Sequence, residues 1–139
     1  WPSKLRLHAR DLEAGHLRGL RRNFEALAQL EVAGAPTADQ LERCLHAEAG
    51  DALEFPWREG WGALVLSNLP YGVRVGDTEE VEELHRAFGR MLRERCSGYS
   101  LALLLGDKRL AHALGLQEWK ARELRNGALR CQFVTTRLP

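Results

Sequence analysis

The sequence predicts an α/β fold in which a mostly parallel, doubly wound sheet ends in an antiparallel hairpin. Candidate strands alternate with candidate helices along the 139 residues, which is the pattern of parallel sheets. Two strand candidates, Ala63–Leu66 and Tyr99–Leu105, are continuous apolar runs, as expected for strands buried on both faces. The composition, with 45% hydrophobic and 28% charged residues, is that of an ordinary globular domain.

The N-terminal part of the chain is expected to form a strand, a long helix and a second strand. Alternating apolar residues predict a short strand over Leu5–Ala9. Apolar residues at helical spacing predict a helix over 14–33, which a glycine and a proline would end. Thr37–Arg43 could be a helical turn or a loop insertion, and Leu45–Ala49 is a strand candidate. The apolar stripe of the long helix consists of Leu17, Leu20, Phe24, Leu27, Ala28 and Val32.

The middle of the chain is expected to hold a loop, a buried strand and a second long helix. Phe55–Trp61 contains a proline and a glycine and is interpreted as a loop or a short irregular helix. After the apolar run Ala63–Leu66, a helix is predicted from Asp77 or Thr78 to about Cys96, with acidic residues in its first turns. Its expected buried stripe is Val81, Leu84, Phe88, Met91 and Leu92.

The C-terminal part is expected to form a short helix and a hairpin. The helix is predicted over Asp107–Leu114. The strands Glu118–Leu124 and Ala128–Thr136 flank Asn126-Gly127, and both of these residue types tolerate the positive φ of tight hairpin turns.

The cysteines and the absence of long apolar runs indicate the cellular compartment that is expected for the protein. Cys44, Cys96 and Cys131 are far apart, odd in number and without a CxxC pair, so neither a disulfide scaffold nor a metal site is expected. No run of about 18 apolar residues and no leader-like segment is present, so no membrane span is expected. Buried thiols in a cytoplasmic protein are the expectation. The net charge of +1 is low for a free-standing RNA-binding domain.

The segment Asn68-Leu69-Pro70-Tyr71 directly follows a predicted buried strand, where ligands bind in open parallel sheets. The side-chain carbonyl of Asn68 and the backbone carbonyl of Leu69, constrained by Pro70, could accept hydrogen bonds from the exocyclic amine of a base. Tyr71 could stack on that base. Such an arrangement would orient the amine toward a methyl donor without a strong base. The alternative is a simple turn, although the strand before and the helix after favour a site.

This segment resembles a known signature. Asn68-Leu69-Pro70-Tyr71-Gly72 is similar to the Asn/Asp-Pro-Pro-Tyr motif of amino-directed, S-adenosylmethionine-dependent methyltransferases. Ser67–Arg74 resembles the form found in the THUMP-associated RNA guanine-N2 methyltransferases. Leu69 stands where the motif has its first proline, and we expect this to be tolerated because the backbone carbonyl is the functional atom. Phe88–Leu92 resembles the family's helix after the signature. Leu114–Leu116 and Asn126–Cys131 resemble its closing strands and are most similar to the bacterial enzymes that act on large-subunit ribosomal RNA.

The resemblance implies a Rossmann-like class I methyltransferase fold, with S-adenosylmethionine as cofactor and guanine in RNA as substrate. Ribosomal RNA is favoured over tRNA. The implied cofactor-binding residues are Asp11 with Leu12 for the ribose hydroxyls, Asp51 with Ala52 for the adenine, and Asn68. A lone aspartate at the end of a strand is, however, commonly a helix cap.

The resemblance also implies substrate-binding residues, namely Tyr71, Gly72 and Arg74, with Arg74 placed to meet a phosphate. Other basic residues could extend that surface, although a solvated helix face is the ordinary role for the arginines at 18, 21 and 22. The candidates for extension are Lys108, Arg109, Lys120, Arg122 and Arg125.

One feature of the family is missing from this sequence. Nothing matches its first strand and its glycine-rich loop, Asp-x-x-x-Gly-x-Gly, so residues 1–139 are interpreted as a partial methyltransferase catalytic domain. An upstream segment is expected to carry that loop and an RNA-binding domain. Alternatively, another chain supplies the missing strand, or the chain is a degenerate remnant.

Other functions stay open from the sequence. One is a non-catalytic binding or scaffold module with a methyltransferase-like fold. Another is an amino-methyltransferase that acts on DNA adenine or protein glutamine. An exposed sheet edge, where the first strand should pair, could also support a homo-oligomer.

Overall fold

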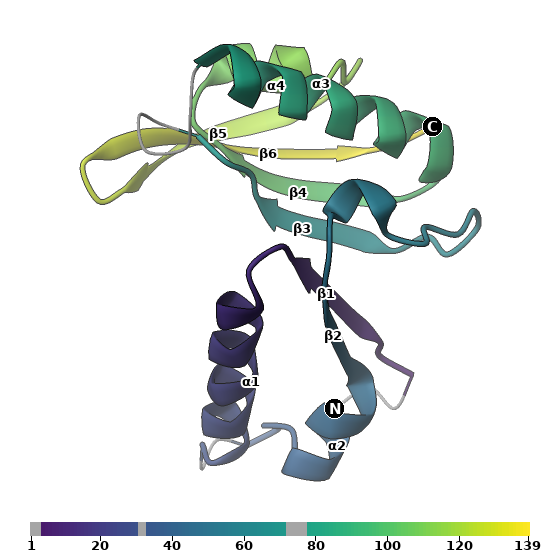
Figure 1. The fold of residues 1–139 in the computed structure, drawn as a ribbon, viewed down its shortest axis with the longest axis vertical. Helices are drawn as coiled ribbons and strands as arrows, with labels where there is room; N and C mark the ends of the chain where they lie inside the picture. The colour runs from purple at the N-terminus through teal and green to yellow at the C-terminus, as the bar shows by residue number, and fades with distance from the viewer. Residues whose placement is uncertain (1–3, 31–32, 72–77) are drawn as a thin grey trace. The chain divides into compact units, whose positions relative to one another are not determined.

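The computed structural model describes residues 4–30, 33–71 and 78–139. The chain divides into two compact units, Trp1–Phe55 and Pro56–Pro139, and each is considered by itself (Figure 1). Within the described ranges, no helix combines the length and apolar character needed to cross a membrane.

The first unit is a two-stranded parallel sheet with two helices. Leu7 lies opposite Leu45 and Asp11 opposite Ala49, so the carboxyl ends of both strands meet at one edge. The strand at Leu45–Ala49 is confirmed, whereas the first strand begins two residues later than predicted because its pairing partners set its ends. The elements are β1 (Leu7–Asp11), α1 (Ala14–Ala28), α2 (Ala38–Cys44), β2 (Leu45–Ala49) and the 3-10 turn η1 (Ala52–Glu54).

Helix α1 carries the predicted apolar stripe on one side, but it is shorter than predicted. Leu17 is buried, and the next stripe residues, from Leu20 to Ala28, are only half-buried. The helix ends at Ala28, and the N–H of Gln29 donates to the carbonyl of Ala26 at 3.1 Å. Val32 lies outside the described residues.

Of the two alternatives for residues 37–43, the structure has the helical one, as helix α2, and not a loop insertion. It begins with a capping box in which the N–H of Gln40 donates to Oγ1 of Thr37 at 3.3 Å. The Gln40 side chain accepts in return from the N–H of Thr37 at 2.9 Å. This Thr-x-x-Gln pattern is a recognised helix-start signal and could have predicted the helix.

The second unit is a four-stranded mixed sheet in the order β3-β4-β6-β5. β3 and β4 are parallel, and β6 runs antiparallel to both β4 and β5. Helices α3 and α4 lie on the same face of this sheet (Figure 1). The elements are β3 (Leu64–Asn68), α3 (Thr78–Arg95), β4 (Ser100–Leu105), α4 (Lys108–Ala113), β5 (Lys120–Asn126) and β6 (Leu129–Arg137).

Strand β3 corrects the expectation that its apolar run is buried on both faces. Val65 is buried, but Leu64 and Leu66 are 62% and 73% exposed. β3 is an edge strand of the described sheet, and its side chains alternate between two faces, of which one is covered. Strand β4, which lies between two neighbours, is buried along most of its length as predicted.

Helix α3 has nearly the predicted bounds, but one member of its buried stripe was wrong. Leu84 is 37% exposed, and the fully buried residue is His85. On a helical projection Leu84 lies toward the edge of the stripe, whereas His85 lies near its centre, four residues after Val81. Burial of the imidazole is tolerated because its Nδ1 bonds the carbonyl of Val81 at 2.7 Å.

The hairpin is confirmed, but its turn lies one residue later than expected. Asn126 is still paired with Leu129, so Gly127 and Ala128 form the two-residue loop. Gly127 has φ of +61°, while no described non-glycine residue has positive φ. Positive φ at the first loop position alone is typical of a type II′ turn, which explains why glycine is needed there.

Candidate active site

The segment Asn68-Leu69-Pro70-Tyr71 leaves the sheet at the carboxyl end of β3, next to β4. Leu69 is buried, and its N–H donates to the carbonyl of Leu104 at 3.1 Å. Proline has no N–H and could not form this bond. Leucine in place of the motif's first proline therefore adds a backbone hydrogen bond to the sheet. The backbone carbonyl of residue 69, which is the functional atom, is present with either residue.

Tyr71 lies against the hairpin and against the backbone that follows β4. Its hydroxyl accepts a hydrogen bond from Nδ2 of Asn126 at 2.9 Å. A hydrogen bond with the buried thiol of Cys131 raises the pKa of Tyr71, and the bond from Asn126 lowers it to a smaller extent. A Cβ on Gly106 would lie 2.7 Å from Cβ of Tyr71, so the backbone after β4 fits closely against this side chain.

Asn68 is the last residue of β3 and is exposed, level with Leu104 of β4. Its amide is thus accessible at the end of the strand, as the proposed role requires. Gly72 and Arg74, predicted to bind substrate, lie outside the described residues.

The four predicted cofactor residues outside this segment all lie in the first unit. Asp11 ends β1, and its Oδ1 accepts from the N–H of Glu13 at 2.8 Å and lies 3.1 Å from Nδ1 of His16. Asp51 follows β2, and its Oδ1 accepts from the N–H of Leu53 at 2.8 Å, so it caps η1.

These residues fit a cofactor that carries a ribose and an adenine. Because β1 and β2 are parallel and in register, the carboxylates of Asp11 and Asp51 belong to the same edge of the sheet. Both residues are half-buried, while Leu12 and Ala52 beside them are exposed. Ribose hydroxyls and the adenine amino group donate hydrogen bonds, and a carboxylate is a suitable partner because it only accepts them. A carboxylate can also accept several hydrogen bonds at once. The capping role of Asp51 therefore does not exclude cofactor binding.

The surroundings of Tyr71 were not found from the sequence. The sequence predicts Asn126 as a turn residue and Cys131 as a buried thiol, and the resemblance covers both, but neither residue was connected with Tyr71. Gly106, the residue that follows the buried run of β4, was not considered. A glycine at the carboxyl end of a strand beside the candidate segment was the available signal, since close backbone approach often requires glycine.

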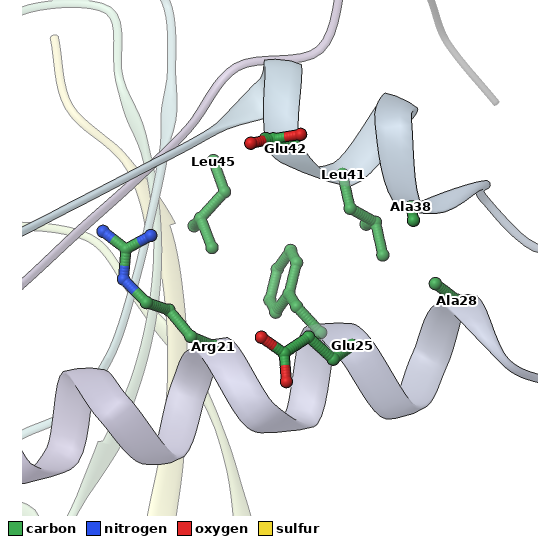
Figure 2. A pocket seen from close by; sticks show the side chains of 8 residues that line it. Arg21, Glu25, Ala28, Ala38, Leu41, Glu42 and Leu45 are labelled. Atoms are coloured by element: carbon green, nitrogen blue, oxygen red, sulfur yellow. The ribbon is translucent and has the colours of Figure 1, made fainter.

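A separate pocket of about 330 Å³ lies in the first unit, between α1 and the α2–β2 segment. Figure 2 shows Ala28 opposite Leu41 and Ala38 at one end of the groove, with Leu45 near Arg21 at the other end. None of the predicted site residues that the structure describes lines it, so we interpret it as a packing groove and not as the active site. Its lining residues are Arg21, Phe24, Glu25, Ala28, Ala38, Leu41, Glu42 and Leu45.

Curated relatives of this chain are named for one activity. The ribosomal RNA large subunit methyltransferase K/L of Allochromatium vinosum is 33% identical over 137 residues, which cover 96% of this chain and 18% of that protein. The protein of the same name from Syntrophotalea carbinolica is 34% identical over 103 residues, or 74% of this chain and 14% of its own length. The chain thus spans less than a fifth of the length of either relative.

Solved structures share the fold. A possible methylase from Clostridium difficile 630 matches 99% of this chain and 33% of its own, with a TM-score of 0.77 and 23% identity. A protein crystallised in complex with SAH matches 96% of this chain and 32% of its own, with a TM-score of 0.73 and 21% identity. The Rossmann-like α/β class predicted from the sequence is confirmed.

The family assignment rests on the match to a family model as well as on these relatives. The model is described as the RMKL-like methyltransferase domain and matches residues 6–135, almost the whole chain. The chain belongs to the RMKL-like methyltransferase domain family.

Proposed function

We propose that this chain transfers a methyl group from S-adenosylmethionine to the exocyclic amine of a guanine in RNA, with ribosomal RNA favoured over tRNA. The observation that carries the proposal is the anchored segment after β3. Leu69 is bonded to β4 and Tyr71 to the hairpin, so the segment Leu69-Pro70-Tyr71 is fixed at both ends as it leaves the sheet.

Each residue of the segment has a role in this proposal. The side-chain carbonyl of Asn68 and the backbone carbonyl of Leu69 accept the two hydrogens of the amine, and Pro70 limits the backbone between Leu69 and Tyr71. The cofactor, when bound, supplies an electrophilic methyl group. The residues then act by orientation, which can account for a large part of a rate acceleration without a strong base. Tyr71 stacks on the base.

The first unit supplies the cofactor contacts in the proposal. Asp11, with Leu12, receives the ribose hydroxyls, and Asp51, with Ala52, receives the adenine amine. The printed names of the relatives support ribosomal RNA as substrate, and the SAH held by one structural neighbour supports the cofactor. Gly72 and Arg74 remain the predicted contacts to the nucleotide.

The test uses the complete gene product with methyl-labelled S-adenosylmethionine and ribosomal RNA, followed by nucleoside analysis. Asn68→Ala should lower the rate of transfer on the order of 100-fold, because loss of an orienting contact misplaces the amine. Cofactor affinity, measured by calorimetry, should fall much less than the rate, because Asp11 and Asp51 keep the contacts to the ribose and the adenine in this proposal. Asn23→Ala, an exposed asparagine in α1, is the matched control and should be unaffected.

Several outcomes would contradict the proposal. Full activity of the Asn68 variant would remove the role given to that residue. Methyl-adenine in DNA or methyl-glutamine in protein, in place of methyl-guanine in RNA, would assign a different substrate. A complete gene product that binds neither cofactor nor RNA would favour a non-catalytic scaffold.

A further inference from the structure

Strand β5 has two faces that differ in chemistry. Side chains alternate along a strand, so Lys120, Arg122, Leu124 and Asn126 share one face, which we call the hairpin face. All four are exposed, and Leu124 is 45% exposed. The cross-strand neighbour of Asn126 on the same face is Leu129, which is 51% exposed. The turn of the hairpin projects beyond the rest of the sheet (Figure 1).

The hairpin face is continuous with the candidate active site. Asn126 at its end donates to the hydroxyl of Tyr71 at 2.9 Å. Leu124 lies opposite Cys131, the thiol that also bonds Tyr71. A strand of nucleic acid with one base at Tyr71 would therefore meet this face next.

Two arginines near this face form ion pairs, whereas the basic groups of the hairpin face, like Arg125 on the opposite face of β5, form none among the described residues. Among the described residues, neither Lys120 nor Arg122 forms an ion pair with a carboxylate. Arg109 of α4, in contrast, is bonded to Glu82 at 3.0 Å. Arg130 is paired with Glu123 at 3.7 Å, on the opposite face of the hairpin.

The composition of the hairpin face matches a single-stranded RNA. Lys120 and Arg122 can bind phosphates, and no acidic residue of β5 shares their face. The exposed Leu124 and Leu129 offer apolar contact to unstacked bases, which single-stranded RNA presents. The ordinary alternative is protection of an edge strand from aggregation by charged side chains. Edge protection would work with charges on either face, whereas RNA binding requires the face that adjoins Tyr71.

We propose that the hairpin face, through Lys120 and Arg122, binds the RNA strand that flanks the target base. This inference rests on the proposed function, because it takes the substrate to be RNA and the base to lie at Tyr71. It names a substrate-binding surface in addition to the candidate active site.

The experiment compares two faces of one strand in the complete gene product. Lys120→Gln with Arg122→Gln removes two positive charges from the hairpin face. The sequence also made Arg125 a candidate for this surface, but its side chain lies on the face of β5 opposite to Lys120 and Arg122. Arg125→Gln is therefore the control for charge and for edge protection. Binding of a short fluorescein-labelled single-stranded RNA is measured by anisotropy over a range of salt, and methyl transfer to ribosomal RNA is measured at limiting and saturating RNA.

The double variant should weaken RNA binding on the order of 20-fold at about 0.1 M salt, because each phosphate contact to a single strand contributes about 0.7 to the salt slope. The slope of log Kd against log salt should fall by about 1.4. KM for RNA should rise while kcat stays near the wild-type value, because Asn68 and Tyr71 are untouched. Arg125→Gln should leave all of these values nearly unchanged.

Two failures are distinguishable. Suppose that the wild-type protein methylates RNA, but that Arg125→Gln weakens RNA binding by as much for its one charge as the double variant does for each of its two. The hairpin face is then not a specific RNA-binding surface. The inference is then wrong and the proposed function stands. If the wild-type protein methylates no RNA, or methylates single-stranded DNA instead, both are overturned.

Discussion

The two units of this chain follow similar sequence patterns but bury them to different degrees. In the first unit, α1 has a single buried residue, Leu17, and neither β1 nor β2 contains a buried one. In the second unit, α3 buries six residues and β4 buries four. An apolar stripe specifies which side of a helix should be buried, but burial also requires a sheet wide enough to cover it, and two strands are narrower than four.

Two helical glycines show the same contrast. A Cβ on Gly19 of α1 would meet nothing within 4 Å, whereas a Cβ on Gly89 of α3 would lie 1.9 Å from the carbonyl oxygen of Leu114. Gly89 is therefore required for the approach of α3 to the end of α4. Gly19 has no such neighbour and only weakens its helix.

The largest expected effect comes from exchanging these glycines. Gly89→Ala should destabilise the protein by about 3 kcal/mol or more, since Cβ would clash with backbone that cannot move freely. Gly19→Ala should stabilise it by about 0.5–1 kcal/mol, through helix propensity. Urea unfolding followed by circular dichroism measures both. Equal effects of the two substitutions would show that α3 is not packed as tightly as described.

The next largest difference between the two units is expected in the rates at which their cysteine thiols react. Burial raises the pKa of the Cys96 thiol to about 11, so at pH 8 it should react with a thiol reagent only after the second unit opens. Cys44 is also buried but belongs to the sparsely packed first unit. We expect Cys44 to be modified on the order of tenfold faster, because local opening needs less free energy where fewer apolar contacts are broken. Peptide mapping after timed labelling gives the rates, and identical rates would mean that the units open together.

Filling the groove in the first unit should have a smaller effect. Ala28 lines the pocket of about 330 Å³, opposite Leu41 and Ala38. Ala28→Leu should raise the stability of this unit by about 1 kcal/mol, because it adds apolar contacts without harming helix propensity. Slower hydrogen exchange of α1 amides would be the sign of success. Destabilisation would indicate that the groove cannot accept the added volume.

The smallest effect is expected from pH and concerns the second unit. Burial lowers the pKa of His85, and its bond to Val81 and the charges of Asp107 and Glu82 oppose this only in part. The unfolded chain therefore binds this proton more readily, and the stabilising neutral form is lost as pH falls below the ordinary value of about 6.5. The stability of the wild type should drop with a slope of at most about 1.4 kcal/mol per pH unit from this group. His85→Leu should reduce that slope in urea titrations at several pH values, whereas an unchanged slope would exclude His85 as a source of acid sensitivity.

Much of the fold could be predicted because periodicity and turn chemistry are local properties. The spacing of apolar residues determined the apolar sides of α1 and α3, and the strand at Leu45–Ala49 was predicted with its observed bounds. The position of Leu69-Pro70-Tyr71 after a strand was also predicted, although the strand extends to Asn68 instead of ending at Leu66. These features depend on residues within a few positions of one another.

The tertiary structure decided what depends on distant neighbours. It placed His85 and not Leu84 in the core, left Leu64 and Leu66 of β3 exposed, and brought Asn126 to Tyr71 across 55 positions of the chain. Which side chains are buried, and which of them pair, depends on which strands become adjacent and on how many elements cover a given face of the sheet. The sequence alone determined the chemistry available at the end of β3, and the folded chain determined which partners hold it there.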